Sequence, residues 1–213
     1  MTPPTVLVDA AGIDSRFVAL LRPGEVASLG RVADRRRNEF ATGRALLRGL
    51  VGEQFEFLAI RGGPPLLPVG WVGSIAHDDA VAVVAVSSHP AIESIGIDIE
   101  PTTKLDPAMS EMILRPDELG IDAHLAFTLK EATYKAWSAA GGEFLEHHDV
   151  RLTVRDGVFT AEILPGVGMS PDHNIGTLAR SFTGAFAKVE PGGRSGIRPV
   201  GSRWVAAAVH PRH

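Results

Sequence analysis

Residues 94–101, S-I-G-I-D-I-E-P, place two carboxylates in a segment that otherwise resembles a buried strand. Isoleucine occupies every second position, which is the pattern of a half-buried strand, so Asp98 and Glu100 share the face opposite the isoleucines. Oxygen ligands of this kind suit a hard divalent cation, and magnesium takes one or two carboxylates together with substrate phosphates. The alternative is the exposed face of an edge strand, where charged side chains are common.

A second segment, residues 127–137, reads F-T-L-K-E-A-T-Y-K-A-W and has the apolar spacing of a helix. Glu131 and Lys135 lie four residues apart on one side of that helix. Glu131 would add a carboxylate to those of the strand, and a lysine beside such a site indicates a phosphate-bearing substrate. The alternative is an ordinary surface pair of opposite charges, a common feature of helices.

The scarcity of lysine in this chain favours the functional interpretation of the helix. Of the 21 basic residues only four are lysines, and two of these, Lys130 and Lys135, lie in this one helix. A solvated helix face in this chain would be expected to use arginine instead.

An arginine-rich segment, residues 35–48, reads R-R-R-N-E-F-A-T-G-R-A-L-L-R and is also predicted to be helical. Arg37, Arg44 and Arg48 fall broadly along one side, because four and seven residues are close to whole numbers of helical turns. The segment is either a basic solvated face or an anion-binding face, since the guanidinium group matches phosphate geometry.

Taken together, the G-I-D-I-E strand and the F-T-L-K-E-A-T-Y-K-A-W helix resemble the paired motifs of the 4'-phosphopantetheinyl transferases, specifically the Sfp-type branch. The pattern of that family is a (V/I)-G-(V/I)-D-x-E strand followed by a (F/W)-(S/T/C)-x-K-E-x-x-x-K helix. The resemblance is clearest over residues 35–137, about half of the chain. It implies an α+β fold of two similar lobes related by a pseudo-twofold axis, with the ligand in the cleft between them. The lobes are expected at residues 1–93 and 94–213.

The resemblance implies transfer of 4'-phosphopantetheine from coenzyme A to a serine of an apo carrier protein of the acyl, peptidyl or aryl type. Adenosine 3',5'-bisphosphate would be released. Asp98, Glu100 and Glu131 would hold Mg²⁺, and Mn²⁺ suits the same oxygen ligands. Glu131 would also take the proton of the attacking serine, and Lys135 would bind the pyrophosphate. The nucleophile then belongs to the carrier, which accounts for the lack of a visible Ser-His or Cys-His arrangement.

The same resemblance assigns the contacts with coenzyme A. The expected residues are Arg36, Arg44, Arg48, His77, Lys130 and Lys135, with Arg37 as a further candidate. Arg36 and Arg44 belong to an R-x-x-E-F-x-x-G-R-like helix that contributes basic residues to the 3'-phosphate. His77 ends a G-S-I-A-H segment similar to the family's G-S-(I/L)-(S/T)-H, whose histidine contacts the phosphates of the cofactor.

Two positions depart from the family pattern. Ala76 replaces a hydroxyl residue, which removes a hydrogen bond of about 1 kcal/mol to the cofactor. The loop Gly62-Gly63-Pro64-Pro65 stands where the family commonly has a Gly-Lys-Pro-like loop near the adenine, and its lysine is absent.

The composition excludes several other classes of protein. A chain of 213 residues with 45% hydrophobic and 22% charged residues can bury a sizeable core. Its net charge of −4 argues against a general nucleic-acid or membrane-surface binder. With no cysteine, disulfides and thiolate metal sites are excluded. No signal peptide or membrane span is evident, so a cytoplasmic enzyme is expected, and the family resemblance implies a monomer.

The remaining pattern predicts the following elements. Strands are expected at 5–9, 80–86, 94–100, 150–154, 158–163, 181–189 and 203–209, helices within 13–34 (interrupted at Pro23-Gly24) and at 107–113 and 124–140, and loops at 165–176 and 190–202. The strands at 80–86 and 94–100 are expected to pair as a hairpin, and Asp156-Gly157 to form the turn of a second hairpin. The helix at 124–140 is expected to end at Gly141-Gly142, and His147-His148-Asp149 is interpreted as polar loop rather than a metal site.

Two other functions compete with the transferase. A metal-dependent hydrolase could use the same ligands to split coenzyme A or another pyrophosphate with water as the nucleophile. A non-catalytic module could bind coenzyme A without turnover, which only the departures at Gly63 and Ala76 support. The presence of all three carboxylates and of Lys135 argues against such a module.

Overall fold

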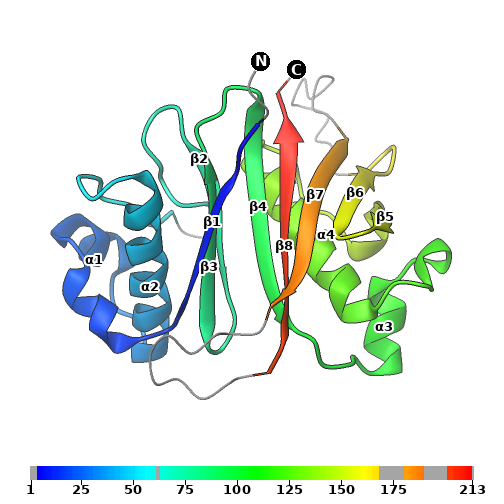
Figure 1. Ribbon diagram of the computed structural model, residues 1–213, viewed down its shortest axis with the longest axis horizontal. Helices are drawn as coiled ribbons and strands as arrows, with labels where there is room; N and C mark the ends of the chain where they lie inside the picture. Colours follow the sequence, from blue (N-terminus) through cyan, green and yellow to red (C-terminus); the bar gives the residue numbers. More distant parts are fainter. Residues whose placement is uncertain (1–3, 61–62, 168–179, 190–200, 213) are drawn as a thin grey trace.

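The computed structural model describes residues 4–60, 63–167, 180–189 and 201–212, and these form a mixed fold of two antiparallel sheets with few helices (Figure 1). The α+β class is therefore confirmed. Figure 1 places α1 and α2 at one end of the molecule, α3 at the other, and β4 and β8 between them. The predicted loops at 165–176 and 190–202 lie largely outside the described residues.

The first sheet is built from the N-terminal part of the chain. The elements of this part of the chain are β1 (Leu7–Gly12), the 3₁₀ helix η1 (Ser15–Leu20), α1 (Pro23–Leu29), α2 (Asp34–Val51), β2 (Val72–His77) and β3 (Val81–Ser87). The strand order is β1-β3-β2. Pro23, where the helical pattern was predicted to be interrupted, begins α1, because proline lacks the N–H that the first turn of a helix leaves unpaired. The sequence pattern did not predict β2.

The second sheet follows the order β4-β8-β7-β6-β5. The elements of this second part of the chain are β4 (Ile92–Pro101), α3 (Pro107–Ile113), the 3₁₀ helix η2 (Pro116–Glu118), α4 (Ala123–Ala139), the 3₁₀ helix η3 (His147–Asp149), β5 (Val150–Arg155), β6 (Val158–Ile163), β7 (Ser181–Val189) and β8 (Arg203–Pro211). The predicted hairpin β5–β6 is confirmed, and its turn residues Asp156 and Gly157 have φ of 49° and 80°. Positive φ at both positions is what a two-residue hairpin turn requires.

The predicted hairpin between 80–86 and 94–100 is wrong. β3 pairs with β1 and β2, whereas β4 pairs with β8. Both edges of β3 are already occupied within its own sheet, so the chain changes sheets between β3 and β4. The two strands meet through side chains instead, since Ile95 and Ile97 of β4 join one buried cluster with Val83 and Ala85 of β3.

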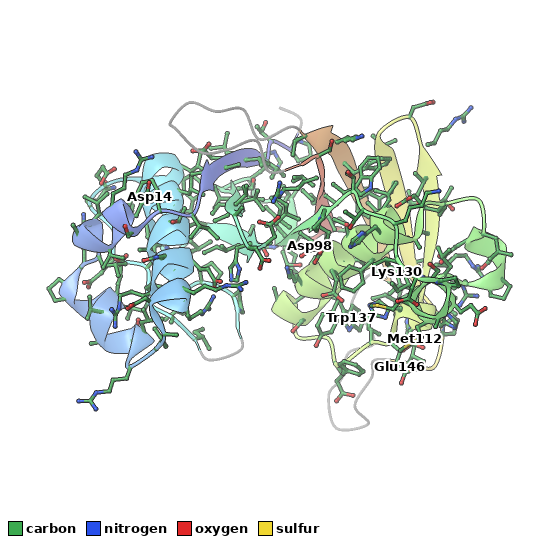
Figure 2. All side chains as sticks on the ribbon, turned by 90° about the horizontal axis from the view of Figure 1, so that it is seen from below. Asp14, Asp98, Met112, Lys130, Trp137 and Glu146 are labelled. Atoms are coloured by element: carbon green, nitrogen blue, oxygen red, sulfur yellow. The ribbon has the colours of Figure 1, made fainter. Side chains whose placement is uncertain are left out.

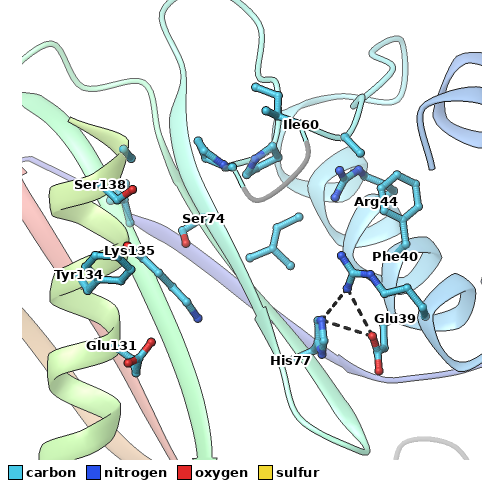
Figure 3. Close-up of a pocket in the computed structure, with 18 residues that line it drawn as sticks. Glu39, Phe40, Arg44, Ile60, Ser74, His77, Glu131, Tyr134, Lys135 and Ser138 are labelled. Carbon is cyan, nitrogen blue, oxygen red and sulfur yellow. Dashed lines mark hydrogen bonds and ion pairs between the residues drawn. The ribbon is translucent and has the colours of Figure 1, made fainter. Parts of the chain in front are cut away.

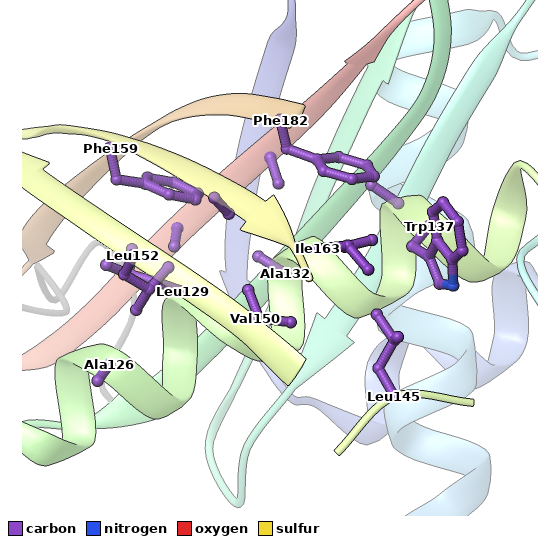
Figure 4. Close-up of a cluster of buried hydrophobic side chains, with 14 of the residues drawn as sticks. Ala126, Leu129, Ala132, Trp137, Leu145, Val150, Leu152, Phe159, Ile163 and Phe182 are labelled. Atoms are coloured by element: carbon purple, nitrogen blue, oxygen red, sulfur yellow. The ribbon is translucent and has the colours of Figure 1, made fainter. Parts of the chain in front are cut away.

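The largest buried cluster lies between α4 and the second sheet (Figure 4). Leu129, Ala132 and Trp137 of α4 pack on side chains from the sheet, including Phe159 and Phe182. The Trp137 indole N–H donates to the Glu143 carbonyl at 2.9 Å, which satisfies its polar atom inside the core. α4 therefore presents one face to the core and leaves another for a site.

The strand β4 and the helix α4 approach each other closely at Gly96. A Cβ at this position would lie 1.9 Å from the Ala132 carbonyl oxygen and 2.6 Å from the Ala136 nitrogen. Beside it, the Ser94 hydroxyl donates to the Ala136 carbonyl at 2.6 Å. Gly96 thus lets the carboxylate face of β4 lie directly against α4.

We expect Gly96→Ala to lower the free energy of unfolding by about 3 kcal/mol, because the new methyl group would overlap helix backbone that has no room to move. Thermal unfolding followed by circular dichroism measures this. Gly120→Ala is the matched control, since nothing lies within 4 Å of the Cβ it would add. Equal melting temperatures for the two variants would contradict the close approach.

The predicted division into residues 1–93 and 94–213, and the pseudo-twofold relation between the two parts, stay predictions. The strands β1, β2 and β3 end before residue 93 and form the first sheet. The strand β4 begins at Ile92 and belongs to the second sheet. Within the described ranges, no helix combines the length and the apolar character that crossing a membrane requires.

Candidate active site

A cavity of about 340 Å³ lies between α2 and β2 on one side and α4 on the other (Figure 3). Its charged and ionisable lining comprises Arg36, Glu39, Arg44, His77, Glu131, Tyr134 and Lys135. Phe40, Ile60, Ile75, Pro64 and Pro65 add apolar surface. The cavity thus joins a basic wall from one sheet to the carboxylate and lysine of the other.

The wall formed by α2 and β2 contains a compact group of Arg36, Glu39 and His77 (Figure 3). Arg36 Nη1 lies 2.8 Å from His77 Nε2 and 3.4 Å from Glu39 Oε2. A guanidinium group can only donate, so His77 Nε2 accepts and the imidazole is neutral with its proton on Nδ1. Burial lowers the pKa of His77, the charge of Glu39 opposes this, and the charge of Arg36 lowers it further.

Glu39 was not singled out by the sequence reasoning, although it is buried at the centre of this group. Besides Arg36, it accepts a hydrogen bond from Arg35 Nε at 2.9 Å. Its position three and four residues after these arginines on one helix is the signal that could have found it. Glu39 orients the arginine and the histidine that border the cavity.

Arg44 also borders the cavity, but most of its guanidinium group serves the fold. Its Nε donates to the Phe57 carbonyl at 2.6 Å and its Nη2 to the Leu58 carbonyl at 3.3 Å. The group lies over the Phe40 ring, 3.9 Å from the centroid. Burial lowers the pKa of Arg44 to about 10, so the residue remains a cation at neutral pH.

On the opposite wall, Lys135 of α4 reaches β4. Its Nζ donates to Asp98 Oδ1 at 2.6 Å and to the Ile97 carbonyl at 3.2 Å. An ammonium group has three N–H donors, so among the described residues one of them is open to a ligand in the cavity. Asp98 is 5% exposed, and its second oxygen, Oδ2, is buried without a hydrogen-bond partner in the described part of the chain.

The carboxylates of this wall repel one another in a buried setting. Burial raises the pKa of Asp98 to about 6, against the opposing effect of Lys135, and the charge of Glu131 raises it as well. Burial raises the pKa of Glu100 to about 7, and the charges of Asp98 and Glu131 add to the shift. Lys135 alone therefore does not balance the three carboxylates, and a further cation would relieve the repulsion.

The residues present fit a divalent cation, because it would relieve the repulsion between the carboxylates and would pair with Asp98 Oδ2, which has no hydrogen-bond partner among the described residues. As the side chains stand, no three histidines or carboxylates in the described ranges are grouped closely enough to hold a metal ion. Asp98 and Glu100 lie beside the cavity rather than in its lining. Their side chains and that of Glu131 would have to turn toward a common ion.

Two histidines lie next to these carboxylates: His147, which was interpreted as part of a polar loop, and His124, which was not singled out from the sequence. His147 Nε2 is 3.4 Å from Glu131 Oε1, and His124 Nε2 is 3.8 Å from Glu100 Oε2. Both contacts join different elements, so no spacing along the chain signals them. Tyr134, Ser74 and Ser138 are further lining residues that only the structure reveals.

Arg48 was predicted to contact coenzyme A, and the structure does not bring it to the cavity. Its Nη1 lies 2.7 Å from Glu25 Oε1 in a fully buried ion pair. Its Nη2 donates to the Leu20 carbonyl at 3.0 Å. The side of α2 that carries Arg48 faces α1, so this arginine ties the two helices together. Arg37, which was predicted on the same side of the helix as Arg44 and Arg48, is paired with Asp34 at the surface.

Lys130 was also predicted to contact coenzyme A, and it too lies away from the cavity. The residue is 2% exposed and its ammonium group is 2.6 Å from Glu118 Oε2. Burial lowers the pKa of Lys130, and the hydrogen bond with Glu118 opposes that effect. Of the two lysines in α4, Lys135 alone borders the cavity.

Comparison with known proteins agrees with the resemblance of the motifs. Residues 25–87 match the family model of the 4'-phosphopantetheinyl transferase N-terminal domain, and residues 94–174 match that of the 4'-phosphopantetheinyl transferase superfamily. The chain is 34% identical over 168 residues to 4'-phosphopantetheinyl transferase Svp of Streptomyces mobaraensis, covering 70% of this chain and 68% of that protein. It is 30% identical over 188 residues to 4'-phosphopantetheinyl transferase Npt of Nocardia iowensis, covering 77% and 82%.

A third relative, 4'-phosphopantetheinyl transferase PptT of Mycobacterium tuberculosis, is 31% identical over 145 residues, which cover 62% of this chain and 64% of that protein. The two family models match either side of the cavity, and the relatives agree over most of the chain. The chain therefore belongs to the 4'-phosphopantetheinyl transferases.

Proposed function

We propose that this protein transfers the 4'-phosphopantetheine group of coenzyme A to a serine of an apo carrier protein of the acyl, peptidyl or aryl type. The observation that carries the proposal is the position of Lys135 and Glu131, which border one cavity with the basic wall of Arg36 and His77. Family membership supports the same activity, since the relatives are named for it.

In this proposal the cavity binds the phosphates of coenzyme A. Arg36 and His77 form the wall for the 3'-phosphate, with Arg44 contributing charge from behind Phe40. The N–H of Lys135 that the described residues leave open binds the pyrophosphate, because Lys135 lines the cavity while it is bonded to the buried Asp98. Together these groups hold coenzyme A with its pyrophosphate placed for in-line displacement.

Glu131 is the proposed base. The serine oxygen of the carrier attacks the pyrophosphate phosphorus that bears the pantetheine arm, and Glu131 takes the hydroxyl proton. The bond from that phosphorus to the bridging oxygen breaks, and adenosine 3',5'-bisphosphate leaves with the electron pair. A magnesium ion held by Asp98, Glu100 and Glu131 would supply positive charge for the pyrophosphate when bound.

Three finer points belong to the proposal. Magnesium is the proposed ion because it combines a few carboxylates with substrate phosphates. A monomer with its lobes at residues 1–93 and 94–213 would contain both walls of the cavity, as this single chain does. The cytoplasm is the proposed location of the protein, because its proposed substrates are coenzyme A and an apo carrier protein.

The test is to mix the protein with coenzyme A, MgCl₂ and an apo carrier protein, and to read the intact mass of the carrier. A gain of one phosphopantetheine, together with release of adenosine 3',5'-bisphosphate, supports the transferase. Consumption of coenzyme A in a control without carrier would instead indicate a hydrolase. Bound coenzyme A that is neither transferred nor consumed would indicate a binding module.

We expect binding of coenzyme A near pH 6.5 to protonate His77. Burial lowers its pKa in the free protein, so it is neutral there, and a phosphate dianion beside it would raise that pKa. Isothermal titration calorimetry in buffers of different ionisation enthalpy measures the protons taken up. His77→Gln provides the baseline, since the phosphate itself also titrates near pH 6. Equal proton uptake by the two proteins would contradict the protonation of His77 by a bound phosphate.

A further inference from the structure

The buried lysine of α4 has no capacity left for a ligand. Lys130 Nζ donates to the Ile113 carbonyl at 2.8 Å, to Glu118 Oε2 at 2.6 Å and to the His147 carbonyl at 2.9 Å. These three acceptors use all three N–H groups of the ammonium. The acceptors come from the end of α3, from η2 and from η3, so a single side chain of α4 holds three other segments.

Glu118 completes this connection from the other side. Its Oε1 accepts from the Leu152 N–H at 2.7 Å, and its Oε2 also accepts from the Arg115 N–H at 3.1 Å. Glu118 is 1% exposed. The Lys130–Glu118 pair therefore joins α4, the segment 113–118, η3 and the first strand of the β5–β6 hairpin at one point in the core.

The segments held by the pair border Glu131. Lys130 and Glu131 are consecutive in α4, so their side chains leave the helix about 100° apart. One points into the core and the other into the cavity. The backbone of His147 is bound to Lys130, and the imidazole of the same residue lies 3.4 Å from Glu131. Figure 2 shows Lys130 within the half of the molecule that contains Met112 and Glu146, away from Asp98 near the centre.

The opposite side of α4 is fixed by different contacts. Gly96 allows β4 to touch the helix backbone at Ala132, and Ser94 binds the Ala136 carbonyl. These contacts set the distance between α4 and β4, but they leave the far side of the helix to other residues. The Lys130–Glu118 pair supplies the directional contacts on that far side.

We propose that Lys130 and Glu118 are positioning residues for Glu131. Their buried pair sets α4 and η3 in the arrangement that aims the Glu131 carboxylate at the cavity. This inference rests on the proposed function, in which Glu131 takes the proton of the serine. It assigns the lysine next to the base to the core of the protein, and it separates the roles of the two lysines of α4.

The test uses the double variant Lys130→Met/Glu118→Gln in the full chain. It removes both charges together, so neither is left buried and unpaired, and methionine fills a similar space. We expect kcat for carrier modification to fall about 10- to 100-fold, as is typical when a supporting partner of a functional group is lost. The Kd for coenzyme A, measured by calorimetry without divalent ions, is expected to stay within about 3-fold, because Arg36 and His77 lie on α2 and β2 and Lys135 is held by Asp98 of β4 rather than by the pair.

Two controls separate positioning from loss of folded protein. The calorimetric stoichiometry counts the molecules that bind coenzyme A, and kcat is expressed per binding-competent molecule. Phe159→Leu removes core packing in the same sheet without touching the pair, since Phe159 lies on β6. If Phe159→Leu lowers the melting temperature as much as the double variant does, we expect this control to keep the wild-type kcat per binding-competent molecule.

The singles Lys130→Met and Glu118→Gln complete a double-mutant cycle, in which the double variant is expected to be no slower than either single. Glu118→Asp keeps the charge but shortens the side chain, and we expect it to lose kcat several-fold without weakening coenzyme A binding. If the double variant does not fold, the kcat of Glu118→Asp tests the positioning role by itself.

A wild-type kcat in the double variant, or in Glu118→Asp if only that variant folds, would overturn the inference. A loss of kcat in Phe159→Leu as large as that in the double variant would also overturn the inference. If the wild-type protein itself modifies no carrier, the proposed function fails and the inference fails with it. If the wild-type protein is active and the variants match it, only the positioning role is lost.

Discussion

Replacing Glu131 by glutamine is expected to reduce the rate of carrier modification about 1000-fold, within the range that a general base contributes. Glutamine keeps the size of the side chain but cannot accept the serine proton, and it removes one negative charge from the three carboxylates. The Kd for coenzyme A without divalent ions is expected to change by less than about 3-fold, because Lys135, Arg36 and His77 remain. Intact-mass assays of the carrier over time give the rate.

Glu143→Gln is the matched control for this variant. It makes the same chemical change at an exposed glutamate after the end of α4 and is expected to leave the rate unchanged. A Glu131→Gln variant that kept more than about a tenth of the wild-type rate would contradict the role of base. Recovery of the rate at raised magnesium concentration would restrict Glu131 to binding the ion.

The second large effect is expected for Asp98→Asn, which should reduce the rate about 100- to 1000-fold and abolish stabilisation by magnesium. Asp98 Oδ2 is buried without a partner in the described residues, and its pKa of about 6 reflects burial that a cation would offset. In the wild-type protein, magnesium at 100 times its Kd should add about 2.7 kcal/mol to the free energy of unfolding. For a chain of this length, that raises the melting temperature by roughly 5–10 °C.

Thermal unfolding with and without MgCl₂ measures this difference directly, without reference to activity. Asp156→Asn is the matched control, because the β5–β6 turn is exposed and asparagine tolerates the positive φ found there. We expect the control to show the full increase in melting temperature with magnesium. An equal increase in Asp98→Asn would place the ion elsewhere.

Much of the local structure is determined by the sequence alone. Alternating isoleucines put Asp98 and Glu100 on one face of β4, and the structure has them opposite Ile97 and its neighbours in the buried cluster. Asp156-Gly157 specifies a hairpin turn, and Gly141, with φ of 93°, lies just after the end of α4. These features depend on residues a few positions apart, so the spacing of the side chains is sufficient to predict them.

The sequence also specified the family, because the two motifs are a joint pattern of residue types. Their spacing could show that Lys130 and Lys135 leave α4 in different directions, since five residues correspond to about 140° beyond a full turn. It could not show which direction leads to the cavity. That depends on Glu118 and the His147 carbonyl, which cover one side of the helix after the chain has folded back.

The tertiary structure likewise decided the pairing of the strands and the partners of the arginines. β4 pairs with β8, which begins about a hundred residues later in the chain, and Arg48 of α2 forms an ion pair with Glu25 of α1. Such contacts are selected by burial, because a charged group leaves water at a large cost unless an opposite charge or hydrogen-bond partners are in place. Local spacing determined the elements and the candidate groups, whereas long-range burial determined which of those groups reach the cavity and which hold the core.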